Sequence, residues 1–241
     1  MEDIKIDVDL ATFRAGLTDV EKRQFPFAAA LALNDVAQDT VEGFREEMSE
    51  EFDRPTRWTL SAFFVRRATK AKLSALVERK TPQRGRHYLA IQSSGGQRQK
   101  TGLEKLLVSR LPYAGNLEAV VPAKGAKLNS SGNWSPGQRN QVLSILKSQR
   151  DSTANTTDRS AKRAKGRASY FVPKPGGPLT PGVYQRTGAK RRGVVKVLHF
   201  LSAVPNYRQG VHFKEAAEHE VRSKFLGHFR KRFAAAMASA K

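Results

Sequence analysis

Apolar side chains recur at helical spacing in two long stretches, one near each end of the chain. In residues 27–52 the stripe consists of Ala30, Leu33, Ala37, Val41, Phe44, Met48 and Phe52. In residues 212–240 it consists of Phe213, Ala217, Val221, Phe225, Phe229, Phe233 and Met237. Gaps of three and four place side chains on one face of a helix. We therefore predict two long helices, the first beginning at Pro26, since proline is tolerated in the first helical turn.

Outside these stretches the apolar pattern is typical of strands and short helices. Residues 4–9 alternate apolar and charged side chains, as a half-buried strand does. Apolar runs predict further strands at residues 73–79, 103–111, 117–121, 170–172, 182–186 and 194–200. Residues 56–68 and 138–149 are predicted as shorter helices. The order predicts an α+β fold, a mostly antiparallel sheet packed with a long N-terminal helix and a long C-terminal helix.

One region in the middle of the chain lacks the residues that a packed core needs. Residues 125–137 are predicted as loop, and residues 150–168 are polar and basic, with only alanine as apolar content. Such a composition buries too little apolar surface to offset the entropy of ordering. We therefore predict a single domain over residues 1–241, with a mobile insertion at about 125–168.

Charge changes this picture, because it is large and unevenly distributed. The net charge is +21, yet residues 1–53 carry 14 acidic and 5 basic residues, a net of −9. Residues 54–241 carry 38 basic and 8 acidic residues, a net of +30. Such asymmetry indicates a nucleic-acid surface or an acidic partner. A head-to-tail ring is a third interpretation, in which the acidic face of one copy meets the basic face of the next.

The acidic candidates lie on the first predicted helix, opposite its apolar stripe. They are Asp35, Asp39, Glu42, Glu46 and Glu50. Their spacing indicates either a solvated helix face or a surface that docks on a basic neighbour, so we treat them as candidate subunit-interface residues.

The basic candidates for contacts with DNA or with a protein partner occur as pairs and one triplet. They are Arg66, Arg67, Arg84, Arg86, Lys162, Arg163, Lys190, Arg191 and Arg192. For each pair alone, a solvated surface is the alternative. Together, a net of +30 over 188 residues indicates that the protein meets negative charge, whether of DNA or of protein.

The sequence offers little for catalysis. It contains no cysteine, no phosphate-binding loop and no nucleophile elbow, and only 8 of its 22 acidic residues follow residue 53. A hydrolase or metal-dependent nuclease needs clustered carboxylates. We therefore expect no enzymatic activity, no metal and no cofactor. No apolar run approaches a membrane span, and the charged N-terminus lacks a signal-peptide core, so we expect a protein made in the cytoplasm.

Two regions of the chain carry a resemblance to a known family. The first is residues 25–37, a proline followed by small apolar residues and Asn-Asp-Val-Ala, with the basic stretch 57–68 after it. The second comprises Pro-Gly-Val-Tyr-Gln-Arg at 181–186, a basic turn, residues 194–198 and 203–205, and a terminal basic helix. This arrangement resembles the minor tail protein Z, or tail-completion (neck), family of lambda-like siphophages. The resemblance covers half of the chain and leaves residues 125–168 without a counterpart.

What the resemblance implies is a structural virion protein, assembled in the bacterial host cytoplasm, that acts in tail completion or head-tail joining. It would form a homohexameric ring around the DNA channel at the head-proximal end of the tail tube. The implied neighbours are tail-terminator, tail-tube or head-connector proteins, with genomic DNA in the channel. The alternative is a free basic nucleic-acid-binding protein of a packaging or nucleoid type.

Overall fold

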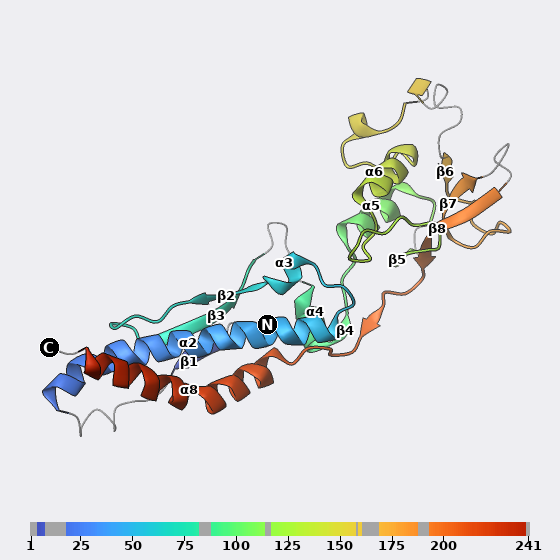
Figure 1. Cartoon of the computed structure of the whole chain (residues 1–241). Helices are drawn as coiled ribbons and strands as arrows, with labels where there is room; N and C mark the ends of the chain where they lie inside the picture. Colours follow the sequence, from blue (N-terminus) through green and yellow to red (C-terminus); the bar gives the residue numbers. More distant parts are fainter. Residues whose placement is uncertain are drawn as a thin grey trace. The chain divides into compact units, whose positions relative to one another are not determined.

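The chain forms two units, and one of them is inserted in sequence into the other (Figure 1). Unit 1 comprises Met1–Gly95 and Arg208–Lys241, and unit 2 comprises Gly96–Tyr207. The prediction of a single domain therefore differs from this computed structural model, because residues 125–168 are only part of a longer inserted unit. The model describes residues 4–7, 18–81, 88–113, 117–157, 159–160, 169–187 and 193–239.

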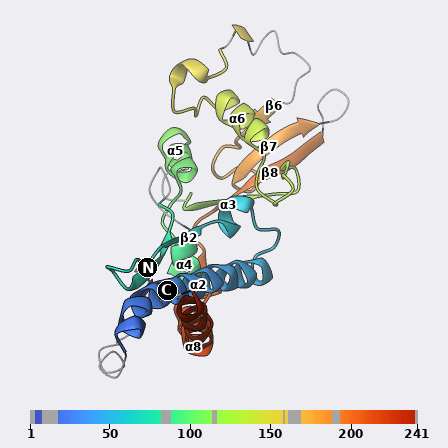
Figure 2. The ribbon, with the colours of Figure 1, turned by 60° about the vertical axis from the view of Figure 1, so that its left-hand side comes forward.

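Unit 1 consists mainly of two long helices and an antiparallel sheet that packs on them. The chain's first long helix, α2, lies along its last, α8, in both Figure 1 and Figure 2. The antiparallel sheet has the order β1-β3-β2. The elements of unit 1 are β1 (Ile4–Asp7), α2 (Asp19–Glu51), α3 (Arg57–Leu60), β2 (Phe63–Arg66), β3 (Ser74–Arg79), α4 (Leu89–Ser94) and α8 (Phe213–Ala238).

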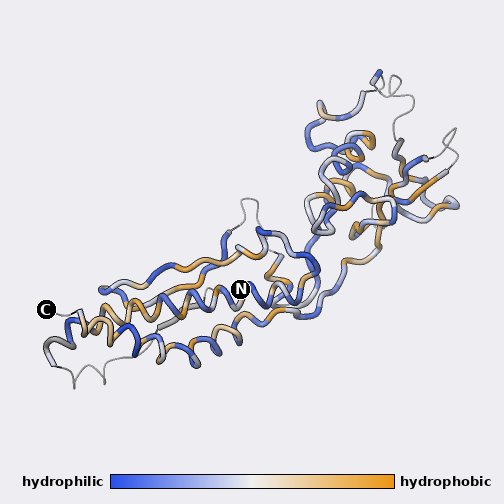
Figure 3. Tube along the Cα trace, viewed as in Figure 1, coloured by the Kyte–Doolittle hydropathy of each residue, from blue (hydrophilic) through white to orange (hydrophobic). Residues whose placement is uncertain are grey.

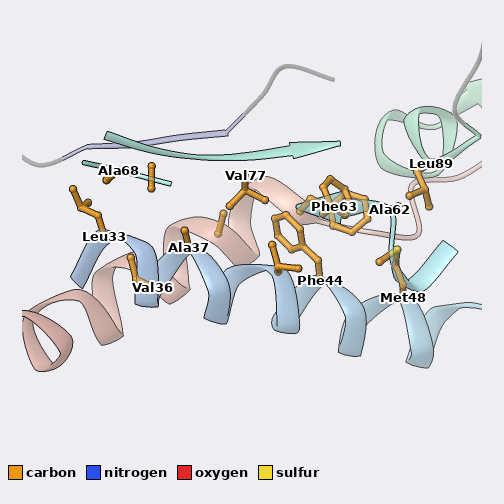
Figure 4. Packing of buried hydrophobic residues seen from close by; sticks show 14 of the residues in the cluster. Leu33, Val36, Ala37, Phe44, Met48, Ala62, Phe63, Ala68, Val77 and Leu89 are labelled. Carbon is orange, nitrogen blue, oxygen red and sulfur yellow. The ribbon is translucent and has the colours of Figure 1, made fainter. Parts of the chain in front are cut away.

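The core of unit 1 lies where α2 meets the sheet and α8 (Figure 4). Polar and apolar residues alternate in bands along α2 in Figure 3. The predicted stripe is buried except for Phe52, which is only partly buried. The buried surface of α2 is wider than the stripe, because it also includes Phe25, Ala28, Ala29, Ala32 and Val36. Phe44 of α2, Phe63 of β2 and Phe213 of α8 contact one another, with ring centroids 4.8–4.9 Å apart. Nearer the start of α2, Phe25 packs on Phe229 of α8. Apolar burial at these two clusters therefore holds helix α2 and helix α8 together.

Unit 2 is a second antiparallel sheet with two helices on one of its faces. The strand order is β5-β8-β7-β6, and the short pair β4 and β9 joins residues 96–97 to 206–207. Leu107 and Leu143 from the helices pack against Val183 and Leu198 of the sheet. The elements are β4 (Gly96–Gln97), α5 (Gly102–Arg110), β5 (Ala119–Pro122), α6 (Pro136–Ile145), the 3₁₀ turn η1 (Ser152–Ala154), β6 (Ser169–Phe171), β7 (Gly182–Thr187), β8 (Gly193–Leu201) and β9 (Asn206–Tyr207).

The predicted α+β class, with its long N-terminal and C-terminal helices, is confirmed, although the described strands form three sheets rather than one. Two predictions of single elements were wrong in part, and a third was wrong. Helix α2 begins at Asp19 and includes Pro26. Residues 56–68 form one helical turn and then strand β2, in which Phe63 is buried and Phe64 exposed. The predicted strand 103–111 is instead helix α5 (Gly102–Arg110), at whose start Thr101 and Glu104 form a capping box.

Unit 2, expressed alone as residues 96–207, is expected to fold cooperatively. It has an apolar core of its own, and its two ends pair with each other through Gly96 and Tyr207. A single thermal transition by circular dichroism and a dispersed amide NMR spectrum would bear this out. The same segment with Leu198→Asp, which places a charge in the core, serves as the unfolded control. An isolated segment as disordered as that control would show that unit 2 depends on unit 1.

Candidate functional surfaces

Two of the five acidic residues proposed for a subunit interface face the chain's own C-terminal helix. Asp35 accepts two hydrogen bonds from Arg232, at 2.6 Å from Nε and 2.8 Å from Nη2. Asp39 lies 2.9 Å from Nε2 of His228. The hydrogen bond from Arg232, opposed by burial, lowers the pKa of Asp35 below its ordinary value. The basic neighbour of this part of α2 is therefore α8 of the same chain.

The other three acidic candidates differ in their surroundings. Glu42 forms an ion pair with Arg45, one helical turn further along α2. Glu46 and Glu50 are exposed. The predicted acidic face is thus divided, and Glu46 and Glu50 are the members that remain open to a second subunit.

Of the basic candidates, the structure describes only Arg66 and Arg67. Arg66 lies on the outer side of β2 and forms an ion pair of 2.8 Å with Glu78 of β3. Arg67 follows it and is exposed. The remaining candidates lie outside the described residues: Arg84, Arg86, Lys162, Arg163, Lys190, Arg191 and Arg192.

The positive charge of the protein belongs mainly to the inserted unit. Unit 2 holds 20 of the 43 basic residues and 4 of the 22 acidic ones, a net charge of +16 over 112 residues. Unit 1 has a net charge of +5. Two of the four acids in unit 2 are neutralised within it, Glu104 by Arg98 and Glu118 by Lys100. A division of the chain at residue 53 does not show this difference in charge between the units. The reason is that residues 54–95 and helix α8, which follow residue 53 in sequence, belong to unit 1 together with the acidic helix α2.

Four side chains of unit 2 form a continuous row across the sheet, which we call the cation–aromatic row: Phe171, Tyr184, Arg186 and Lys196. Strand pairing places Tyr184 of β7 between Phe171 of β6 and Lys196 of β8. The two rings are stacked, with centroids 5.8 Å apart and an interplanar angle of 26°. Arg186 Cζ lies 4.7 Å from the centroid of the Phe171 ring, and Lys196 Nζ lies 5.4 Å from that of Tyr184. Each ring therefore holds one cation.

Neighbouring residues fix the row in place. Lys196 Nζ donates a hydrogen bond of 2.6 Å to Thr180 Oγ1, and the Tyr184 hydroxyl donates one of 2.9 Å to the Thr180 carbonyl. A side chain at Gly182 would place its Cβ 2.6 Å from Lys196 Cε and 2.3 Å from the Leu198 carbonyl oxygen. Only glycine leaves the space through which the Lys196 stem crosses β7.

The row lies on the sheet face opposite the helices. Successive residues of a strand point to opposite faces, and Val183 lies in the core with α5 and α6. The pairing of β7 with β8 shifts register between Val183 and Tyr184. Gly182, two residues before Tyr184, faces the Lys196 side chain, which confirms that this face is the one opposite Val183. Sequence reasoning noted residues 181–186 but missed the row, because its members come from three strands and only their register brings them together. The available signal was Tyr184-x-Arg186, an aromatic and a basic residue on one face of one predicted strand.

The described residues contain no group of three or more His, Asp or Glu side chains placed to hold a metal ion. Among the helices of the described part of the chain, none has the length and apolar character to cross a membrane. Comparison with protein-family models, with curated proteins and with solved structures finds no match to this chain. The resemblance to the tail-completion family therefore stays a prediction.

Proposed function

We propose that this chain is a structural subunit of a tailed-bacteriophage virion that acts in tail completion or head-tail joining, as one member of a ring around the DNA channel. The observation that carries the proposal is the resemblance at residues 25–37, 57–68 and 181–198. These segments coincide with α2, with α3 and β2, and with β7 and β8, which frame the cores of both units. The likeness thus involves residues that determine the fold.

The two units suit different tasks in such an assembly. Unit 1 offers a rigid body, because its helix pair and sheet share one core and its acids Asp35 and Asp39 are held by α8. In a hexameric head-to-tail ring, Glu46 and Glu50 of one copy would meet basic residues such as Arg67 of the next. Tail-terminator, tail-tube or head-connector proteins would be the neighbouring rings. Unit 2, with its net charge of +16, would meet DNA or an acidic surface.

The alternative function is a free nucleic-acid-binding protein. The observation that favours it is the scarcity of acids in unit 2, where 4 acidic residues stand against 20 basic ones among 112 residues. Such a protein would act on nucleic acid in the cytoplasm without entering the virion.

A phage whose copy of this gene carries an early stop codon is expected to produce filled heads and separate tails. The reason is that a missing ring leaves no surface on which the head connector can join the tail. Negative-stain electron microscopy of the lysate measures the fraction of joined particles, and a plasmid copy of the wild-type gene should restore it. Normally joined, infectious particles from the mutant would rule the assignment out and favour the free nucleic-acid-binding protein.

A further inference from the structure

We propose that the cation–aromatic row of unit 2 binds the phosphate backbone of double-stranded DNA, with Arg186 and Lys196 as the contacting cations. This site goes beyond the virion role, since it would serve a free DNA-binding protein equally. None of its four residues is among the basic candidates that the sequence indicated.

The two cations of the row form no ion pair with the acids that the structure describes. Among the described residues, neither Arg186 nor Lys196 lies within ion-pair distance of a carboxylate. The described acids of unit 2 are committed elsewhere: Glu104 and Glu118 to ion pairs, and Asp151 to capping the η1 turn. The described acids of unit 2 therefore leave both cations available to a negative partner from outside the chain.

Both cations are already held in position by their neighbours in unit 2. Arg186 rests on the Phe171 ring, and Lys196 is held by the Tyr184 ring and by Thr180. Surface arginine and lysine side chains usually lose rotamer entropy when they bind. Here the fold has restricted them beforehand. A stacked guanidinium also keeps its N–H groups free at its edge for a phosphate oxygen.

The two rings of the row restrict how it can bind nucleic acid. Tyr184 is only 6% exposed, and the faces of both rings are occupied by each other and by the cations. These rings are therefore closed to stacking with unpaired bases, the interaction on which single-strand platforms depend. Contacts from charged groups to phosphates remain, and these are independent of sequence.

Duplex DNA is favoured over an acidic protein by the extent of the charge. The net +16 of unit 2 spreads well beyond the two cations of the row. A duplex presents one negative charge about every 1.7 Å of its axis, so it can meet such a surface along its whole length. An acidic protein would need an acidic patch whose size and shape match this basic surface.

The test is a salt titration of DNA affinity with the full-length protein and a short labelled duplex of mixed sequence, followed by fluorescence anisotropy. The double variant Arg186→Gln/Lys196→Met removes both phosphate contacts and keeps the side-chain bulk. We expect its slope of log K against log salt to be shallower by about 1.8, which is about 0.9 for each lost contact. At about 50 mM salt its binding should be at least tenfold weaker, as expected for losing charged hydrogen bonds.

The matched control removes an equal number of positive charges, two, from the face of unit 2 that carries the helices. Lys105 of α5 and Arg139 of α6 are both exposed, so Lys105→Gln/Arg139→Gln should keep the wild-type slope. The charge-preserving variant Arg186→Lys/Lys196→Arg should keep it as well. If the first double variant lacks the wild-type melting transition, Arg186→Gln alone is used, with an expected loss of about 0.9 in slope.

Three outcomes would overturn the proposal. The first is an equal loss of slope in the row variant and in the helical-face control, since the charge would then act only as a diffuse field. The second is a row variant that binds the duplex as the wild type does. The third is a wild type that binds poly-glutamate but leaves the duplex free at low salt, which would assign the row to an acidic protein.

The particle assembly experiment does not measure DNA affinity, so the failure of either proposal can be told from the failure of the other.

Discussion

Glu104→Ala is expected to destabilise unit 2 by about 3–5 kcal/mol, the usual cost of removing one partner from a buried ion pair. The Glu104 side chain is 1% exposed and accepts two hydrogen bonds from Arg98, at 2.6 and 2.7 Å. It also accepts hydrogen bonds from the Thr101 backbone, the Thr101 hydroxyl and the Val120 backbone. One carboxylate thus joins the segment after β4, the start of α5 and strand β5, and its removal leaves the buried donors of all three without a partner.

Equilibrium urea unfolding of unit 2, followed by circular dichroism, measures this effect. Glu118→Gln is the matched control, because Glu118 forms a single ion pair with Lys100 and its side chain is 31% exposed. Its expected cost is about 1 kcal/mol or less. If Glu104→Ala were no more destabilised than this control, the central place of the Glu104 carboxylate in unit 2 would be disproved.

The same carboxylate makes the stability of unit 2 dependent on pH. Burial opposes ionisation of Glu104, but the hydrogen bonds from Arg98, Thr101 and Val120 outweigh it and lower its pKa from 4.5 to about 2. Because the pKa in the folded state is depressed, the contribution is present above the unfolded value of 4.5 and is lost as pH falls toward 2. The contribution at neutral pH is about 3 kcal/mol. In Glu104→Gln this part of the acid sensitivity should be absent.

Phe44→Ala is expected to cost unit 1 about 3–5 kcal/mol, because a buried phenylalanine leaves both lost contacts and a cavity. Phe44 is fully buried, and its ring contacts Phe63 at 4.9 Å and Phe213 at 4.8 Å between centroids. These three rings come from α2, β2 and α8. The substitution should therefore loosen the sheet and the C-terminal helix together, so the whole of unit 1 should unfold earlier in a denaturant titration.

The control for this prediction is the residue next to Phe63 in the sequence. Phe64 is 41% exposed and points to the outer face of the sheet, so Phe64→Ala should cost roughly 1 kcal/mol or less. Phe44→Leu, which preserves most of the apolar volume, should fall between the two. Equal losses for Phe44→Ala and Phe64→Ala would contradict a core centred on the three rings.

The elements that could be predicted are those with a regular local pattern. The stripes that include Leu33 and Phe229 identified α2 and α8, alternation identified β1, and apolar runs identified β7 and β8. The helix α5 was mistaken for a strand because its apolar run is as short as a strand's. Thr101 and Glu104, a capping-box pair three residues apart, were the local signal for a helix.

The candidate surfaces could be predicted less well, since a list of charges does not say which charges meet. The acids of α2 were recognised, yet Arg232, the partner of Asp35, lies 197 residues away in sequence. The basic triplet Lys190–Arg192 is visible in the sequence as three consecutive basic residues. Arg186 and Lys196 became candidates only because the structure places them over aromatic rings.

By itself, the sequence determined the two amphipathic helices, most of the strands, the α+β class and the excess of positive charge, because each depends on composition or on short-range periodicity. Only the tertiary structure decided that residues 96–207 form a separate unit, since that rests on pairing such as Gly96 with Tyr207. It also decided that Asp35 faces α8 and that Arg186 and Lys196 flank stacked rings. The physical reason is that such contacts join residues far apart in the chain, and strand register and helix packing choose among many partners of equal chemistry.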